Sequence, residues 1–424
     1  MKTSDYSPNS ASTFQVLAWV ICLIAALNYS YDFFIRAAPG VMEHQLETAF
    51  NVGKIGLGWL SSAYFISYTL MQIPAGIIID RFDRKIVIGT ATMLCVLGNF
   101  LFSATNSYEV AFAGRILMGI GSAFGFIGAA KMAAMWLPNR LYSTFIGFAT
   151  IIGILGGLVT NTVLAGLVRD LGWKAGNDVF TYIGVVIFIL IIIFIKDNKE
   201  YVKNSQKLNN TSIKDVLSNL SKIFTSRNFI IACIIGATIF IPINVLGSLW
   251  GSGFIESKLH VGTPVADYIN SMLFIGTALG FGIFAIIAPF TNRLRFMLML
   301  SLVSMLLISI ALVYIPMSKT LFIPLYFLLG VMAGPQAVTF TIAKVMSPKG
   351  NSATSAAGVN MVNNLFPVIL LPVIGYILVA FNTTELLKTG QDASAGYVYA
   401  LSLMVIILAV AIPLTMLLPK HIEH

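Results

Sequence analysis

Long apolar segments dominate this sequence of 424 residues and constrain its fold more than any other feature. About 20 apolar residues are enough to span the ~30 Å hydrocarbon core of a bilayer. Twelve such segments can be counted, with approximate limits 14–40, 53–79, 86–104, 108–136, 143–168, 178–195, 228–250, 264–289, 296–315, 320–346, 352–380 and 397–418. In hydrocarbon a segment must satisfy its own backbone hydrogen bonds, and these segments are too long for barrel strands. The sequence therefore predicts an all-α integral membrane protein with twelve transmembrane helices.

Composition and charge agree with this prediction. The chain is 57% hydrophobic and 10% charged, whereas a soluble domain carries about 25% charged residues. The net charge of +9 does not indicate nucleic-acid binding, because most of the 26 Lys and Arg fall in segments on one predicted side of the membrane. We therefore expect a bacterial cytoplasmic (inner) membrane protein with both termini in the cytoplasm.

One hydrophilic segment divides the predicted helices into two sets of six. Residues 196–227 form a lysine-rich cytoplasmic linker between a bundle at 1–195 and a second at 228–424. Apolar residues within the linker recur at helical spacing, which fits either a short helix on the membrane surface or a solvated connection. The loop at 289–295 resembles the loop after the second apolar segment, so the two halves are weak repeats.

The loop between the second and third apolar segments carries the most specific motif. Residues 76–85 read Gly-Ile-Ile-Ile-Asp-Arg-Phe-Asp-Arg-Lys. A loop this short makes the flanking helices antiparallel neighbours, and its cations mark the cytoplasmic side. The motif positions are Gly76, Asp80, Arg81, Arg84 and Lys85.

This motif resembles the signature loop between helices 2 and 3 of the major facilitator superfamily, although Asp83 stands where that family usually has glycine. The resemblance implies two six-helix bundles that rock about a central cavity. It also implies that Gly76 lets two helices approach closely and that the Asp80–Lys85 loop latches the inner gate in the outward-open state. We expect a monomer in the lipid bilayer that carries a small-molecule substrate and needs no cofactor.

Charged residues inside apolar segments are informative, because a lone charge at the bilayer centre costs at least ~2.5 kcal/mol. In the first segment, Asn28, Asp32 and Arg36 follow one another at intervals of four and share a helix face. Asp32 is the candidate proton-binding carboxylate. Arg36 is the candidate group that holds either Asp32 or an anionic substrate. The alternative is a static Asp32–Arg36 ion pair at the outer membrane boundary.

The stretch 28–40 also resembles the organic anion:cation symporter and phthalate-type branches of the superfamily. The pair Asn28-Tyr29, followed by an acid and an arginine, carries this resemblance, with residues 72–76 of the second segment. Here the acid and the arginine are four residues apart rather than adjacent. The resemblance implies that Asn28, Tyr29 and Arg36 contact an organic anion.

Two further cations lie in the fourth segment. Arg115 begins a stretch that resembles the superfamily's fourth-helix motif, which implies a role in proton coupling. The alternative is an arginine that extends to the outer surface beside Glu109. Lys131 follows 16 residues later, so an ideal helix does not point both side chains into one cavity. Lys131, together with Lys344 of the tenth segment, would favour an anionic substrate if both reached the cavity.

Uncharged polar residues complete the candidate substrate site. Each fits either substrate binding or hydrogen bonding between helices. They are Tyr64, Asn244, Trp250, Gln336, Asn360 and Asn364.

Sequence signatures of enzymes and motors are absent. The chain has no Gly-x4-Gly-Lys-Ser/Thr, His-Glu-x-x-His or Gly-x-Ser-x-Gly motif, and its four histidines lie outside the apolar segments, so no metal site is indicated. We predict a secondary transporter rather than an enzyme, with proton-coupled uptake of a small organic anion or amino acid. The alternatives are an exporter of a metabolite, siderophore or drug, and a membrane receptor or assembly subunit that does not transport.

Overall fold

The computed structural model describes residues 8–198, 224–288, 293–345, 352–381 and 394–419. All the regular structure in these ranges is helical. Within the described residues, eleven helices are long and apolar enough to cross a membrane, and one bent pair supplies a twelfth span. This confirms the predicted all-α fold with twelve transmembrane helices.

The N-terminal half contains six spans and one short helix. A hydrophilic helix, α2, follows the first span, and the fifth span passes through a π-helical turn, η1. The elements are α1 (Pro8–Val41), α2 (Glu43–Phe50), α3 (Lys54–Arg81), α4 (Arg84–Ala104), α5 (Tyr108–Trp136), α6 (Asn139–Val159), η1 (Thr160–Leu164), α7 (Ala165–Leu171) and α8 (Trp173–Phe194).

The C-terminal half contains six further spans, several of them interrupted. The elements are α11 (Arg227–Ile239), α12 (Ile241–Val245), η2 (Leu246–Trp250), α13 (Gly251–Leu259), α14 (Thr263–Ile287), α15 (Leu294–Tyr314), α16 (Lys319–Val331), α17 (Gln336–Val345), α18 (Ser352–Asn363), α19 (Leu365–Ala380) and α21 (Ser394–Met416).

The seventh span is longer than predicted. It continues to Leu259 rather than ending near Trp250, and it bends by 53° between α11 and α12. Pro242 at the start of α12 has no backbone N–H to continue the helical hydrogen bonds, which accounts for a break at this point. The predicted surface helix of the linker lies outside the described residues, and the bundle limits at 195 and 228 remain a prediction.

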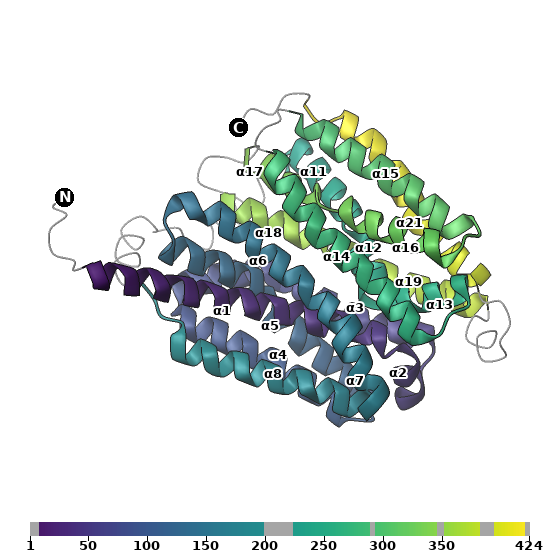
Figure 1. The fold of residues 1–424 in the computed structure, drawn as a ribbon, viewed down its shortest axis with the longest axis horizontal. Coiled ribbons are helices and arrows are strands. Elements are labelled where there is room, and N and C mark those ends of the chain that lie inside the picture. Colours follow the sequence, from purple (N-terminus) through teal and green to yellow (C-terminus); the bar gives the residue numbers. More distant parts are fainter. Residues whose placement is uncertain (1–7, 199–223, 289–292, 346–351, 382–393, 420–424) are drawn as a thin grey trace.

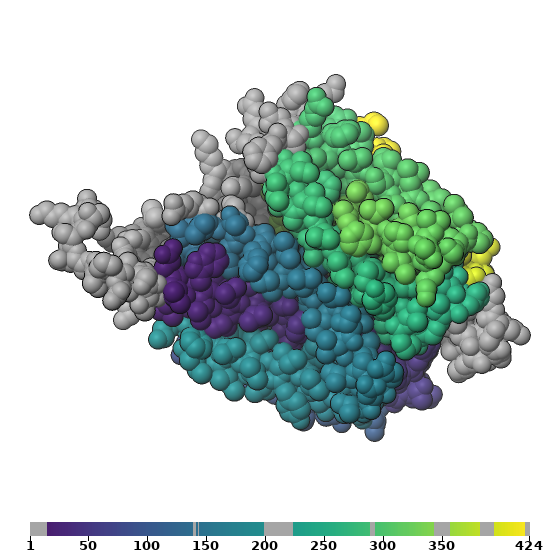
Figure 2. Space-filling view, viewed as in Figure 1, coloured from purple at the N-terminus to yellow at the C-terminus, as the bar shows by residue number. Residues whose placement is uncertain are grey.

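The two halves lie side by side, with the N-terminal half in purple to teal and the C-terminal half in green to yellow (Figure 1). Their most extensive contacts join α3 to α19 and α6 to α14. Glycines make the first contact possible, because a Cβ at Gly58 would lie 2.6 Å from the Leu371 carbonyl oxygen and one at Gly375 would lie 2.5 Å from that of Lys54. Figure 2 shows the two halves as adjoining lobes.

Candidate functional site

Arg36 is a buried cation on α1 with no acidic partner. Only 4% of the residue is exposed. Among the described residues no carboxylate lies within 4.0 Å of its guanidinium, so the alternative of a static Asp32–Arg36 ion pair is wrong. The guanidinium carbon instead lies over aromatic rings, 4.6 Å from the centroid of Phe33, 5.0 Å from that of Tyr68 and 5.5 Å from that of Tyr64. These rings attract the cation without neutralising its charge.

Asp32 is buried one helical turn before Arg36. Its exposed fraction is 1%, and its Oδ2 atom has no hydrogen-bond partner. The carboxyl group faces Gly125 of α5, where an added Cβ would overlap Oδ2. The glycine therefore creates the space that the acid occupies between α1 and α5.

Arg115 lies in the interior of the N-terminal half rather than at its surface. Its Nη1 donates to the Ile35 carbonyl at 2.6 Å, its Nε to the Leu60 carbonyl at 3.4 Å, and its guanidinium lies 4.9 Å from the centre of the Tyr64 ring. Glu109 accepts instead from the Ser107 hydroxyl at 2.6 Å. The alternative of an arginine extending to the surface beside Glu109 is therefore wrong.

The remaining N-terminal candidates connect helices around these charges. The Thr92 hydroxyl donates to Asn28 Oδ1 at 2.7 Å, and the Tyr64 hydroxyl donates to the Asp32 carbonyl at 3.4 Å. The Tyr29 ring lies 5.4 Å from that of Phe126, between α1 and α5. The structure thus brings most of the predicted N-terminal residues together.

Asn360 of α18 joins the two halves beside this group. Its Nδ2 donates to the Tyr68 hydroxyl at 3.1 Å and to Gln72 Oε1 at 3.0 Å, both on α3. Asn364 Nδ2 donates to the Asn360 carbonyl at 2.8 Å. Since Tyr68 also contacts Arg36, the cation and the amides belong to one continuous polar region.

Three other candidates are buried in the C-terminal half. Asn244 donates to the Asn363 carbonyl at 3.1 Å, and Trp250 Nε1 donates to the Leu371 carbonyl at 3.2 Å. These contacts bind helices of the C-terminal half to one another, as the alternative for uncharged residues predicted. Gln336 is buried at the start of α17.

Two residues near the charged loop after α3, Lys131 of α5 and Gly76 of α3, differ from expectation. Lys131 pairs with Asp80 at 2.6 Å instead of standing in a central cavity. Gly76 has open space around it, since an added Cβ would meet nothing within 4 Å, so it makes no close helix contact here.

Arg84 and Asp83 of the loop itself form an ion pair and a helix cap, respectively. Arg84 pairs with Asp197 at 3.1 Å, and the Asp83 side chain caps α4 by accepting from the Ile86 N–H at 3.1 Å. Asp83 therefore acts as the N-cap of α4 at a position where the family usually has glycine. Arg81 ends α3 and Lys85 lies in the first turn of α4. The side chain of Lys344 lies outside the described part of the chain.

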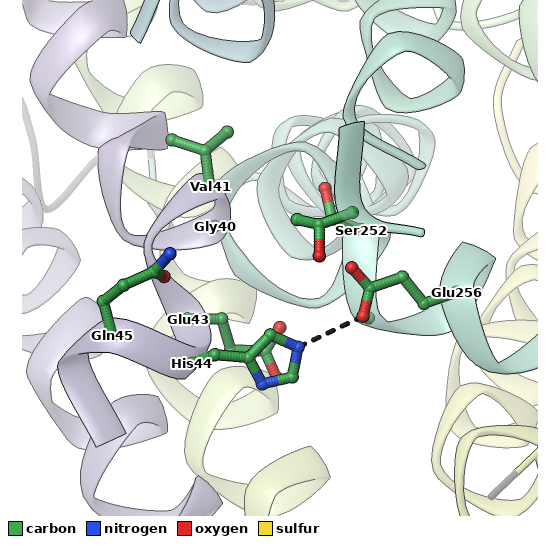
Figure 3. A pocket seen from close by; sticks show the side chains of 9 residues that line it. Gly40, Val41, Glu43, His44, Gln45, Ser252 and Glu256 are labelled. Carbon is green, nitrogen blue, oxygen red and sulfur yellow. Dashed lines mark hydrogen bonds and ion pairs between the residues drawn. The ribbon is translucent and has the colours of Figure 1, made fainter. Parts of the chain in front are cut away.

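Sequence reasoning missed a second charged cluster, at the end of the molecule where α2 lies. Lys54 is fully buried, pairs with Glu43 and lies 3.4 Å from Glu47. His44 reaches across to Glu256 of α13 at 3.1 Å (Figure 3). The sequence signal was the hydrophilic segment of α2, which carries two glutamates and a histidine and precedes the lysine that starts α3. This segment lies outside the apolar spans in which charges were considered.

Twelve spans in two halves, with buried charges of both signs between the helices, define a membrane transporter. Residues 21–371 match the model of the Major Facilitator Superfamily. The chain therefore belongs to this superfamily.

Sequence relatives are matched over part of their length. The "Probable galactarate/D-glucarate transporter GarP" of Escherichia coli (strain K12) is 25% identical over 46% of this chain and 44% of its own. The "Probable galactarate/D-glucarate transporter GudP" of Bacillus subtilis (strain 168) is 24% identical over the same shares. The chain thus aligns with less than half of each of these relatives.

Solved structures share the whole fold. A D-xylose-proton symporter superposes with a TM-score of 0.74 at 13% identity, over 95% of this chain and 98% of the other. A bacterial homolog of the human lysosomal transporter Spinster, in an inward-facing and unoccupied conformation, gives a TM-score of 0.74 at 14% identity, over 95% and 96%. These likenesses concern the fold.

Proposed function

We propose that this protein is a proton-coupled importer of a small organic anion, working by alternating access as a monomer in a bacterial inner membrane. Both termini would then lie in the cytoplasm and the α2 end would face outward. The observation that carries the proposal is the Arg36 guanidinium, which is buried with no acidic partner among the residues that the structure describes.

Burying an unpaired cation is costly, so a ligand that supplies a carboxylate at Arg36 would be strongly favoured. The planar guanidinium suits a carboxylate, which it binds through two parallel hydrogen bonds. Hydroxyl and amide groups of Tyr68, Gln72 and Asn360 lie in the same polar region. They would suit substrate hydroxyl groups, and relatives named as galactarate/D-glucarate transporters favour polyhydroxylated dicarboxylates as the substrate class.

Asp32 supports the proton coupling. The residue is buried and its Oδ2 has no hydrogen-bond partner, so ionising it is costly, and we propose that Asp32 carries the transported proton. Asp32 and Arg36 share a helix face. Loss of the proton would therefore create an anion that competes with the substrate for Arg36. This competition would link release of the proton to release of the substrate.

The sequence relatives are named as transporters, which favours transport over a receptor role. We propose transport without chemical change of the substrate. A flux assay distinguishes import of the substrate from its export.

The test is uptake of radiolabelled galactarate or D-glucarate into proteoliposomes under an inward proton gradient, with amino acids as a second panel. We expect uphill uptake of the dicarboxylate and an approximately 100-fold lower affinity in Arg36→Gln, because one charge-assisted contact is worth about 1.5–3 kcal/mol. Arg169→Gln is the matched control, since Arg169 is exposed and already pairs with Asp170 at 2.9 Å. An Arg36→Gln variant with unchanged affinity would contradict the proposal.

A further inference from the structure

The contact between His44 and Glu256 crosses from one half of the molecule to the other. His44 belongs to α2, and its Nε2 lies 3.1 Å from Glu256 Oε2 on α13. Figure 3 shows the two side chains meeting across a small cavity whose walls come from α1, α2, α13 and the start of α14. Among ion pairs that join two described residues, this is the one that connects the N-terminal and C-terminal halves.

The backbone around this contact is closely packed. A Cβ at Gly40 would lie 3.2 Å from the Ser248 carbonyl oxygen, so α1 and η2 touch directly beneath the pair. A Cβ at Gly253 would lie 2.9 Å from Glu43 Oε2, so the N-terminal cluster also fits against α13. The α2 end is therefore closed in this structure, and opening it must separate His44 from Glu256.

His44 also lies 3.9 Å from Glu47 on its own helix, and this contact stays within the N-terminal half. On its own helix, Glu43 and Glu47 face Lys54 of α3, all three within the N-terminal half. These pairs need not change when the halves separate. Glu256 differs, because its partner is a histidine that is charged only when protonated.

Two further groups face this cluster from other helices of the C-terminal half. Asp267 of α14 accepts from the Ser252 hydroxyl at 2.5 Å, and Tyr397 of α21 lies beside Glu43. Neither is paired with His44. His44 is thus the titratable group whose ion pair crosses the dividing surface at the α2 end.

The hydrogen bond to Glu256 raises the pKa of His44 above its usual 6.5. Separation of the halves removes this partner, so the pKa returns toward its ordinary value when the α2 end opens. A group whose pKa is higher in the closed state stabilises that state fully below its open-state pKa, and this contribution is lost as pH rises through the raised value. His44 is 45% exposed at its side chain, so protons from the solution reach it directly.

We propose that His44 and Glu256 form a second proton-binding site, separate from Asp32, at which a proton holds the outer end closed. The inference rests on the proposed function, since it takes the α2 end as the outer gate of an alternating-access transporter. Acid outside the cell would favour closure after loading, and release of this proton would favour reopening. Asp32 would carry the transported proton, while His44 would set the balance between the two conformations.

The experiment measures the distance between spin labels at Thr48→Cys on α2 and Val265→Cys on α14, both exposed, in the full-length protein without substrate. The three native cysteines are buried and leave the introduced sites as the reactive ones. Between about pH 6 and about pH 8 we expect the ratio of open to closed protein to rise roughly fivefold, the range of a partly exposed ion pair. His44→Asn should abolish this response, because asparagine keeps a hydrogen-bond donor but takes up no proton.

The matched control is His260→Asn, another exposed histidine, which ends α13 with a positive φ of 51° that asparagine also accepts. It should respond to pH as the unmodified protein does. Glu256→Gln, which keeps the hydrogen-bonding shape, should lose the response and so serves if His44→Asn does not fold. An unchanged pH response in both His44→Asn and Glu256→Gln would overturn the inference, as would a label distance that ignores pH in the unmodified protein.

The distance measurement needs no substrate, so its outcome is independent of the anion proposal. A protein that opens with rising pH but carries no organic anion contradicts the proposed function alone. A protein that takes up the anion with a pH-independent label distance contradicts the proton-binding latch alone.

Discussion

The two halves of the molecule each contribute six spans, but they bury different polar groups. The middle of the N-terminal half holds charges, among them Asp32, Arg36 and Arg115. The C-terminal half buries amides, such as Asn244, which donates to the backbone, and Asn270, which donates to Asn161. A charge in a membrane interior requires a partner, whereas an amide can be satisfied by its neighbours.

This difference suggests a division of labour between the halves. The N-terminal half would carry the groups that bind an anion and a proton, because only charges attract them strongly. The C-terminal half would supply neutral hydrogen bonds across the dividing surface, such as that from Asn270 to Asn161 at 2.9 Å. Each neutral bond contributes about 1 kcal/mol, so such contacts can form and break during a transport cycle.

The largest effect is expected at the buried lysine of the N-terminal half. Lys54→Met would leave Glu43 and Glu47 without their cation, and breaking a buried ion pair costs about 3–5 kcal/mol. We expect a strong fall in the thermal unfolding midpoint of the purified protein. The counterpart in the other half is Lys258→Met, which removes a part-buried bond to the Val313 carbonyl and should cost less, about 1.5–3 kcal/mol. Equal destabilisation by both would remove the contrast between the halves.

A second test compares the buried acids of the two halves. Asp32→Asn should abolish accumulation of substrate against its gradient. Each unit of the pH gradient supplies about 1.4 kcal/mol per transported proton, a factor of ten in substrate concentration, so losing the proton across about two pH units should lower uphill uptake on the order of 100-fold. Exchange of substrate across the membrane should continue, because it needs no net proton transfer. Asp267→Asn should retain uphill uptake. Accumulation by Asp32→Asn would show that the proton is carried elsewhere.

The smallest effect is expected at the amide that joins the halves. Asn360→Ala removes two hydrogen bonds to α3, and substrate affinity measured by calorimetry should fall roughly tenfold or less. This loss is smaller than that of Arg36→Gln because no charge is involved. If Asn360→Ala weakens binding more than Arg36→Gln does, the assignment of binding to the N-terminal charges is wrong.

Much of the fold followed directly from the sequence. Bilayer thickness sets the length of an apolar span, so the twelve segments and the fold class could be predicted without any coordinates. The loop at 76–85 led to the superfamily that the family match confirms. Asp32, Arg36 and Arg115 stood out because a charge inside an apolar segment needs a reason to be there.

The tertiary structure decided which of these charges have partners. Asp32 and Arg36 lie at the spacing of an ion pair, but Arg36 turns onto aromatic rings supplied by its own helix and by α3. Lys131 pairs with Asp80, 51 residues earlier, which helix periodicity alone does not show. The cluster around Lys54 and His44 was missed because its members lie outside the apolar centres, and its contact with Glu256 forms only when the halves pack. The sequence determines which charged and polar groups need a partner in a membrane. The tertiary structure determines which partner each group finds, because the partners lie on segments far apart in the chain.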